Sequence, residues 1–313
     1  MKMLIHFAFI AVITGNTLAQ GLSDCTLNPA QKQDSINEHI WGGRPDASKI
    51  YPRRAYVLAY NDKYLVPRWT AWHAMKSYRD TPERKTRWSS FRRDPELKTV
   101  TDNDYVGWYG ADENFARGHL TPFFISGGDR DHDGKDAEYE DSLAIEDIDD
   151  ACTVFEINAM TNIAPQYHKA FNGQPGIWWK LETDVRNMID DGREFHIIAG
   201  TVFLEGKAVQ KIGDREKTKR SWKIGVPHGY FKIVIDTQST TAIGFLFDHS
   251  DDLQKGCSLV GRGASWPSEC IVEIADIESV TGLKFFRDVS SADYQKLHGS
   301  KEDARATWLA WVN

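Results

Sequence analysis

Four polar side chains in the middle of the chain have the types and spacing that phosphodiester hydrolysis needs. Arg117 and His119 lie two positions apart, and Asn172 and Glu182 follow downstream. An imidazole can take a proton from water near neutral pH. An amide oxygen suits a hard cation such as Mg²⁺, and a guanidinium matches phosphate oxygens. Together these groups can activate water, hold one metal ion and neutralise a phosphate.

Each of these residues also has an ordinary structural explanation. A histidine such as His119 is often a core or surface residue, and Asn172-Gly173 is a strong turn dipeptide. Glu182 has the usual character of a solvated helix carboxylate, and Arg117 that of a surface charge. The combination of the four, rather than any one, favours a catalytic interpretation.

The segments around these residues resemble the DNA/RNA non-specific endonucleases, the ββα-metal group that includes secreted bacterial nucleases and mitochondrial endonuclease G. The hallmark Asp-Arg-Gly-His reads Ala116-Arg117-Gly118-His119 in this chain. A second hallmark, Asn-x-x-x-Trp-x-x-Leu-Glu after Ser-Pro-Gln, is matched by Ala164-Pro165-Gln166, Phe171-Asn172 and Trp178-Trp179-Lys180-Leu181-Glu182. The likeness extends from about Ala55 to Phe286, which is most of the chain.

The resemblance implies a role for each residue. His119 is then the general base, and Asn172 holds Mg²⁺ or Mn²⁺ together with several waters. Glu182 orients the waters of the ion from outside its ligand shell, and Arg117 contacts the scissile phosphate. The implied reaction is metal-dependent cleavage of DNA and RNA without strong sequence preference, which leaves 5′-phosphate ends.

A second phosphate-binding arginine is expected upstream of Asp94-Pro95. We choose Arg87 for this role, although its spacing is longer than in the family pattern, with Arg92 and Arg93 as alternatives.

Two departures from the family pattern affect the predicted site. Ala116 replaces the aspartate of the hallmark, and two extra residues separate Asn172 from Trp178. Neither departure removes a reacting group, so an active enzyme is favoured. The alternative is a catalytically weak nucleic-acid-binding or calcium-binding extracellular protein on the same scaffold.

An acidic segment inside the predicted domain resembles a calcium-binding loop. The residues 129–140 match the pattern D-x-D-x-D-G followed by five residues and Glu, with candidate ligands Asp129, Asp131, Asp133 and Glu140. Gly127-Gly128 before the loop departs from a full EF-hand. We therefore expect a structural Ca²⁺ site distinct from the catalytic one, with an acidic surface loop as the alternative.

The charge of the chain is unevenly distributed. The formal net charge is −7, yet residues 129–150 hold eleven Asp and Glu against two basic residues. Residues 68–98 instead hold nine Lys and Arg against four acids. This basic stretch could meet a phosphate backbone, or it could be an ordinary solvated surface.

The N-terminus has the features of a secretory signal peptide over residues 1–19. Lys2 precedes an apolar run from Met3 to Ile13, and Thr17-Leu18-Ala19 offers small residues for cleavage near Ala19. The protein is then expected outside the cytoplasm, extracellular or periplasmic, and no later stretch is apolar enough to cross a membrane. The sequence does not indicate an oligomeric state.

Export makes the four cysteines candidate disulfide partners. Cys257 and Cys270 are close in sequence, which would leave Cys25 for Cys152, but four cysteines allow three connectivities and the sequence does not choose among them.

The pattern of apolar residues predicts an α+β fold, because strands and helices are mixed without regular alternation. The predicted elements are a hairpin (55–60 and 69–75), strands at 153–159, 195–203, 231–235 and 241–247, a turn at 162–165, and helices at 178–189 and 272–280. The resemblance implies a central, mostly antiparallel sheet flanked by helices. We place a tail at 20–50, the nuclease domain at 51–288, and a C-terminal tail at 289–313 with an amphipathic helix.

Overall fold

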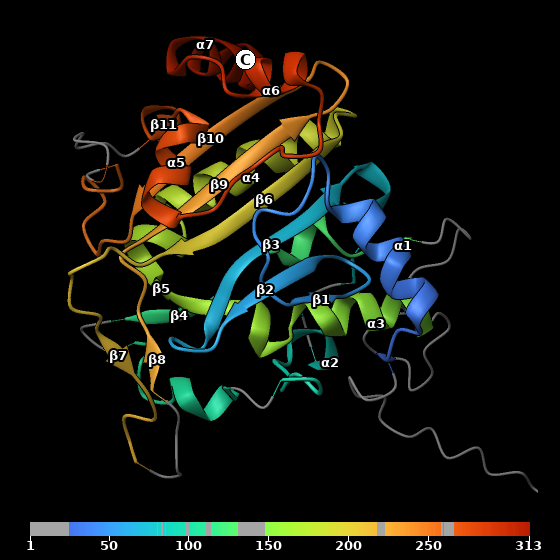
Figure 1. Cartoon of the computed structure of the whole chain (residues 1–313). Coiled ribbons are helices and arrows are strands. Elements are labelled where there is room, and N and C mark those ends of the chain that lie inside the picture. The colour runs from blue at the N-terminus through green and yellow to red at the C-terminus, as the bar shows by residue number, and fades with distance from the viewer. Residues whose placement is uncertain are drawn as a thin grey trace, which may run out of the picture.

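An antiparallel sheet forms the centre of the protein (Figure 1). The computed structural model describes residues 25–79, 81–82, 84, 86–97, 100–110, 114–130, 148–217, 223–257, 259 and 266–313. Within these residues the sheet has seven strands, and every neighbouring pair is antiparallel. Their order is β1 (Ile50–Pro52), β2 (Val57–Asn61), β3 (Val66–Ala74), β6 (Phe195–Val202), β9 (Gly229–Asp236), β10 (Thr241–Asp248) and β11 (Ile271–Val272).

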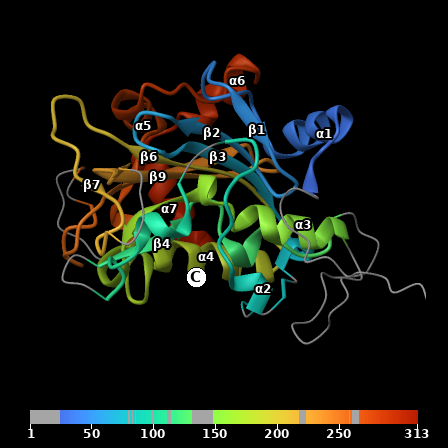
Figure 2. The same cartoon turned by 90° about the horizontal axis from the view of Figure 1, so that it is seen from below.

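Helices cover both faces of this sheet, so the fold is the predicted α+β class (Figure 2). One face packs against α1 (Pro29–His39), α5 (Ile274–Thr281) and α6 (Ser291–Leu297). The other face carries α3 (Ile148–Ile157), α4 (Ile177–Asp190) and α7 (Lys301–Val312). Below the central sheet lie the short helix α2 (Thr86–Ser89) and a separate two-stranded antiparallel sheet of β4 (Phe115–His119) and β5 (Ile163–Tyr167) (Figure 2). A further pair joins β7 (Lys211–Ile212) to β8 (Ile224–Gly225).

The alternation of side chains along β9 shows how the two faces are built. Phe231 and Ile233 belong to the apolar cluster under α5, whereas Tyr230 and Val234 belong to the cluster under α4. Successive side chains of a strand point to opposite faces, so a strand buried on both sides appears as a continuous apolar run. This is why the strand predictions at 195–203, 231–235 and 241–247 are confirmed by β6, β9 and β10.

Two local predictions are wrong. Residues 153–159, expected as a strand, mostly form the helix α3, which begins with Asp149 and Asp150 in its first turn. Carboxylates at that end interact favourably with the helix dipole, and burial of most of the helix removes the amphipathic pattern that would have revealed it. The expected turn at 162–165 contains most of strand β5, which pairs with β4.

Where the structure describes the two predicted tails, from Cys25 and up to Asn313, they pack against the domain rather than extending from it. In α7, Trp308 is buried and its ring meets Phe245 edge-on, with ring centres 4.9 Å apart. The C-terminal segment forms two helices where one was expected, and α5 begins at Ile274 after the short strand β11. Residues 1–19, the expected signal peptide, lie outside the described residues.

Both disulfides that the sequence left open are present. Cys25 pairs with Cys152 and Cys257 pairs with Cys270, with Cα–Cα distances of 5.3 and 5.0 Å. The first bond joins the start of the described chain to α3. No helix of the described residues is both long and apolar enough to cross a membrane.

We expect acid to destabilise the fold because several histidines are buried as neutral groups. Burial lowers the pKa of His39, His119 and His249 from 6.5 to about 3 and that of His196 to about 4. Below pH 6.5 the unfolded chain binds protons on these rings that the folded chain does not, so stability falls as the pH falls. Burial also raises the pKa of Glu156 to about 7 and that of the half-buried Asp184 to about 6. The folded chain therefore binds a proton on each of these carboxyl groups near pH 5, which opposes up to two of the four histidine protons.

The expected loss of unfolding free energy is no more than about 4 kcal/mol per pH unit near pH 5, from roughly two to three extra protons on the unfolded chain. Thermal unfolding at constant ionic strength should give a clearly lower melting temperature at pH 5 than at pH 7. A melting temperature that stays constant or rises over this range would contradict the burial of neutral imidazoles.

Candidate active site

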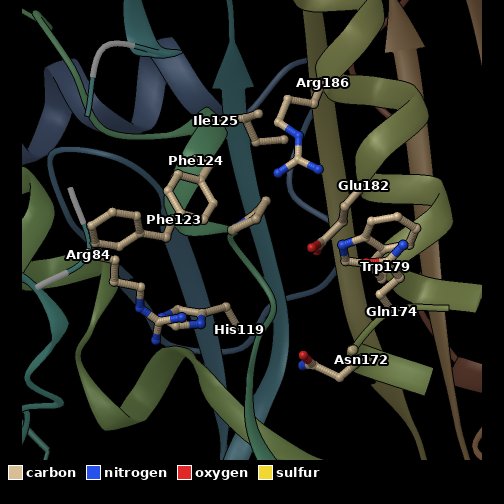
Figure 3. A pocket seen from close by; sticks show the side chains of 12 residues that line it. Arg84, His119, Phe123, Phe124, Ile125, Asn172, Gln174, Trp179, Glu182 and Arg186 are labelled. Atoms are coloured by element: carbon tan, nitrogen blue, oxygen red, sulfur yellow. The ribbon is translucent and has the colours of Figure 1, made fainter. Parts of the chain in front are cut away.

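One pocket brings together side chains from β4, η6 (His168–Asn172) and α4. Its cavity is about 330 Å³, and His119, Asn172 and Glu182 all line it. Figure 3 shows His119 and Asn172 on opposite sides of the cavity, with the carboxylate of Glu182 directed into the space between them. The three residues singled out from the sequence therefore meet in space, although they come from three separate elements.

A hydrogen bond from outside the pocket determines which nitrogen of His119 carries the proton. Asn158 follows α3, and its Nδ2 donates to the carbonyl of Trp88 at 2.9 Å. Its Oδ1 therefore faces His119 Nε2, 3.1 Å away, and can only accept. Nε2 must then be the protonated nitrogen, which leaves Nδ1 as a free base. Asn158 was not found from the sequence, because no local pattern links it to His119.

The environment of His119 keeps its ring neutral. The side chain is buried at the end of β4, and burial together with the positive charge of Arg84 lowers its pKa to about 3. A histidine with such a pKa is unprotonated at neutral pH. The ring is therefore in the state that a general base requires before the reaction.

Asn172 is held so that its amide oxygen remains available. It is the last residue of η6, a π-helical turn, and its Nδ2 donates to Oε1 of the buried Gln166. This hydrogen bond uses the nitrogen side of the amide and leaves Oδ1 as an acceptor. Figure 3 shows the amide directed into the pocket.

The same glutamine explains the glycine between Arg117 and His119. A Cβ atom on Gly118 would collide with the side chain of Gln166, because β4 and β5 are adjacent strands. Only glycine leaves room for the Gln166 amide, which in turn holds Asn172. The Arg-Gly-His spacing is thus a packing requirement as well as a chemical one.

Gly118→Ala should therefore damage the site through Gln166. We expect at least a tenfold fall in cleavage rate, with a loss of stability of about 1–3 kcal/mol from overpacking. Gly244→Ala on β10 is a matched control, since its Cβ would meet Ile277 on α5. Helix α5 covers the face of the sheet opposite to α4, which lines the pocket. The control should lose stability without losing activity per folded molecule. Equal activity losses in both variants would contradict this explanation.

Glu182 forms an ion pair with a lysine that is buried in the core. Its Oε1 accepts a hydrogen bond from Lys232 Nζ at 3.1 Å, and Lys232 is 1% exposed. Burial lowers the pKa of Lys232, and the Glu182 carboxylate opposes that shift. Four residues after Glu182, Arg186 also lines the pocket. This arginine was missed, although its i+4 spacing from Glu182 on the predicted helix could have indicated it.

Among the arginines before Asp94-Pro95, the structure places Arg84 at the pocket instead of Arg87, which was chosen from the sequence. Arg84 lines the pocket, whereas Arg87 and Arg92 are not among the described residues that do. Arg87 lies on α2, and its guanidinium is 5.9 Å from the ring centre of Trp88; that of Arg92 is 3.9 Å from the ring of Phe155. Counting back from Asp94-Pro95 could not reveal these ring contacts, which depend on tertiary packing.

Arg117 lies beside the pocket rather than in its lining. Its guanidinium is 4.3 Å from the ring centre of Phe91, and that of Arg84 is 5.4 Å from the same ring. Arg117 also forms an ion pair with Asp102. The Phe91 ring is in turn 5.4 Å from the His119 ring. Both arginines are therefore close to the imidazole.

The two departures from the family pattern leave this arrangement in place. Ala116 lies opposite Gln166 in the β4–β5 register, so the position of the missing aspartate is occupied by a methyl group. The segment with two extra residues still allows Asn172, Gln174 and Glu182 to line one pocket.

The oxygen atoms of the pocket fit a hard divalent cation. Asn172 offers an amide oxygen, and Glu182 offers a carboxylate nearby, which suits an ion such as Mg²⁺ that keeps most of its waters. Among the described residues, no group of three or more His, Cys, Asp and Glu side chains could hold a metal. Asp131, Asp133 and Glu140 lie outside the described residues, so the calcium loop that begins at Asp129 remains a prediction.

Comparisons with known proteins agree with this fold. The model of the DNA/RNA non-specific endonuclease family matches residues 44–292. A nuclease from Nostoc sp. is 26% identical over 271 residues, 82% of this chain and 83% of the relative. The mitochondrial nuclease EXOG of Danio rerio is 25% identical over 245 residues, 74% of this chain and 59% of that relative.

A solved structure shares the fold. A chain from the crystal structure of the EndoG/EndoGI complex superposes with a TM-score of 0.57 at 18% identity, covering 87% of this chain and 96% of its own. At this level of identity the match concerns the ββα-metal architecture alone.

Proposed function

Because this chain belongs to the DNA/RNA non-specific endonuclease family, we propose that it is a secreted, metal-dependent endonuclease that hydrolyses DNA and RNA and leaves 5′-phosphate ends. The observation that carries the proposal is the convergence of His119, Asn172 and Glu182 on one pocket, with Arg84 and Arg186 in its lining. The pocket therefore contains a base, oxygen atoms that can face a cation, and positive charges that can bind a phosphate.

The residues divide the chemistry as follows. Neutral His119 takes a proton at Nδ1 from the attacking water, while Asn158 holds its other nitrogen. The guanidiniums of Arg84 and Arg117 attract the phosphate and offset the charge that builds on its oxygens. Asn172 would hold Mg²⁺ or Mn²⁺, with Glu182 orienting the waters of the ion, and the bound ion would supply Lewis-acid stabilisation of the phosphoryl oxygens.

Substrate binding should adjust the basicity of His119. Arg84 and Arg117 both lower the pKa of the free imidazole. A bound phosphate would neutralise part of that charge and raise the pKa towards its ordinary value, which makes His119 a stronger base when substrate is present.

Secretion is supported by two observations. The first is the N-terminal apolar run from Met3 to Ile13, followed by a candidate cleavage site near Ala19. The second is the pair of disulfides, a feature of proteins that fold in oxidising compartments. N-terminal sequencing of the protein recovered from the medium or the periplasm would test this part, with Gln20 as the expected first residue.

Cleavage of a closed circular plasmid is the test of the enzymatic proposal. The protein should nick and linearise the plasmid in Mg²⁺, degrade RNA under the same conditions, and do neither in EDTA. The products should accept a label from polynucleotide kinase only after phosphatase treatment. Nucleic-acid binding without cleavage in Mg²⁺ or Mn²⁺ would favour the alternative of a catalytically weak binding protein.

A further inference from the structure

Lys232 is a lysine buried in the apolar face of the sheet. It lies on β9 between Tyr230 and Val234, which point to the same face and belong to the core under α4. Its nearest partners in the sheet are Ala199 on β6 and Phe245 on β10. Lysines are almost never buried this completely unless they are paired, because removing an ammonium group from water is costly.

The ammonium group of Lys232 is directed at one catalytic residue. Nζ lies 3.1 Å from Oε1 of Glu182, and 3.9 Å from the ring centre of Trp178, one turn earlier on α4. The ring of Trp72 is 5.7 Å away on β3, which is separated from β9 by β6 in the sheet. The two indole rings therefore surround the lysine on the side of the core, and Glu182 is the acceptor that its side chain reaches.

The two partners of this ion pair differ in their exposure. Lys232 is 1% exposed, whereas the Glu182 side chain is 22% exposed and lines the pocket. The lysine therefore binds one oxygen from the core side, while the carboxylate extends into the cavity opposite His119 (Figure 3). A glutamate side chain without this contact would have several rotamers available at the edge of an open pocket.

Stability alone is a weak reason to keep such a pair. A buried ion pair is often no better for folding than apolar side chains of similar volume, because its desolvation cost offsets the attraction. An apolar residue at 232 would suit the neighbouring indole rings. The pair is better explained by what it does to Glu182.

We propose that Lys232 is a positioning residue that holds the Glu182 carboxylate towards the pocket and so determines how firmly the hydrated catalytic cation is bound. This inference rests on the proposed function, since it assigns Lys232 to the same metal-dependent site. Lys232 touches neither substrate nor cation in this account, and it acts through Glu182 alone.

Whether Lys232→Met strengthens or weakens metal binding distinguishes a positioning role of Lys232 from a purely electrostatic one. If only charge mattered, removing a cation near the site would tighten the binding of a divalent ion. If orientation matters, Lys232→Met should weaken it. We expect Lys232→Met and Glu182→Gln each to weaken Mn²⁺ binding about tenfold, the lower end of the effect typical of residues behind a metal site.

The test measures Mn²⁺ binding to the whole protein by titration calorimetry, without nucleic acid, for wild type, the two single variants and the double variant. Because Lys232 acts only through Glu182, the double variant should bind Mn²⁺ no more weakly than Glu182→Gln. Cleavage should follow the same pattern, with kcat reduced and KM for DNA unchanged. Lys284→Met, which removes the ion pair of Lys284 with the buried Glu278 on α5 (2.8 Å), is the matched control and should leave both readouts unchanged.

Mn²⁺ affinity that is unchanged or tighter in Lys232→Met would overturn the inference, as would losses that simply add in the double variant. If Lys232→Met fails to fold, Lys232→Gln keeps an N–H donor to Glu182; its affinity should lie between those of wild type and Glu182→Gln, and an affinity below that of Glu182→Gln would equally reject the idea. A wild-type protein that neither binds Mn²⁺ nor cuts plasmid would instead reject the proposed function itself.

Discussion

Replacing His119 by alanine should lower kcat for plasmid cleavage by about 10²–10⁴, the range that a positioned general base contributes. The imidazole is neutral, its Nε2 is held by Asn158, and its free Nδ1 belongs to the ring that lines the pocket. Alanine removes that base without removing the arginines or the oxygen donors. KM for DNA should therefore change much less than kcat.

The measurement is initial-rate cleavage by wild type and His119→Ala, purified in parallel. His228→Ala is the control, because the half-buried His228 is not in the pocket lining that the described residues form, and its two ring nitrogens contact the backbone of Leu204 and Ala208, each at 3.0 Å. The control should keep wild-type activity. Equal rates for wild type and His119→Ala would show that another group activates water, or that a contaminating nuclease does the cutting.

Asn172→Ala should produce the second large loss, about 100-fold or more in kcat/KM. A bound cation stabilises the transition state by several kcal/mol, and each 1.36 kcal/mol corresponds to tenfold in rate. The variant should also bind Mn²⁺ more weakly, because Asn172 Oδ1 is the donor oriented by Gln166. Asn172→Asp keeps an oxygen at the same position and should retain metal binding better than alanine does.

Raising the Mg²⁺ concentration separates weak binding from lost chemistry. If Asn172 holds the ion, high Mg²⁺ should restore part of the activity of Asn172→Ala but none of that of His119→Ala. Asn37→Ala on α1, where Asn37 accepts from Gln33, is the control for general effects of losing an amide. An Mg²⁺ requirement identical in wild type and Asn172→Ala would contradict the assignment of Asn172 to the cation.

The residues of the site were predictable where local patterns connect them to a motif. His119, Asn172 and Glu182 belong to short segments that can be matched directly, and they share a pocket. Arg84 was not separable from Arg87 by sequence, because the choice depends on tertiary packing. Asn158 was missed because it reaches His119 only through the tertiary packing of α3.

The helices and strands were also predictable where a regular local pattern marks them. The apolar periodicity of α4 and the continuous runs of β6, β9 and β10 mark structures whose burial pattern is regular. Helix α3 is buried nearly all round, so its β-branched residues suggested a strand, and packing overrode that preference. In the predicted strand at 231–235, Lys232 is the one departure from apolarity, and its contact with Glu182 gives that departure a physical reason.

A crystal soaked in Mn²⁺ would show whether this pocket holds the catalytic cation, because the anomalous signal locates the ion without any assumption about activity. We expect one strong peak in the pocket beside Asn172 Oδ1, on the side that faces His119 and Glu182. An ion found only elsewhere, or an empty pocket at saturating Mn²⁺, would show that these residues do not bind the cation.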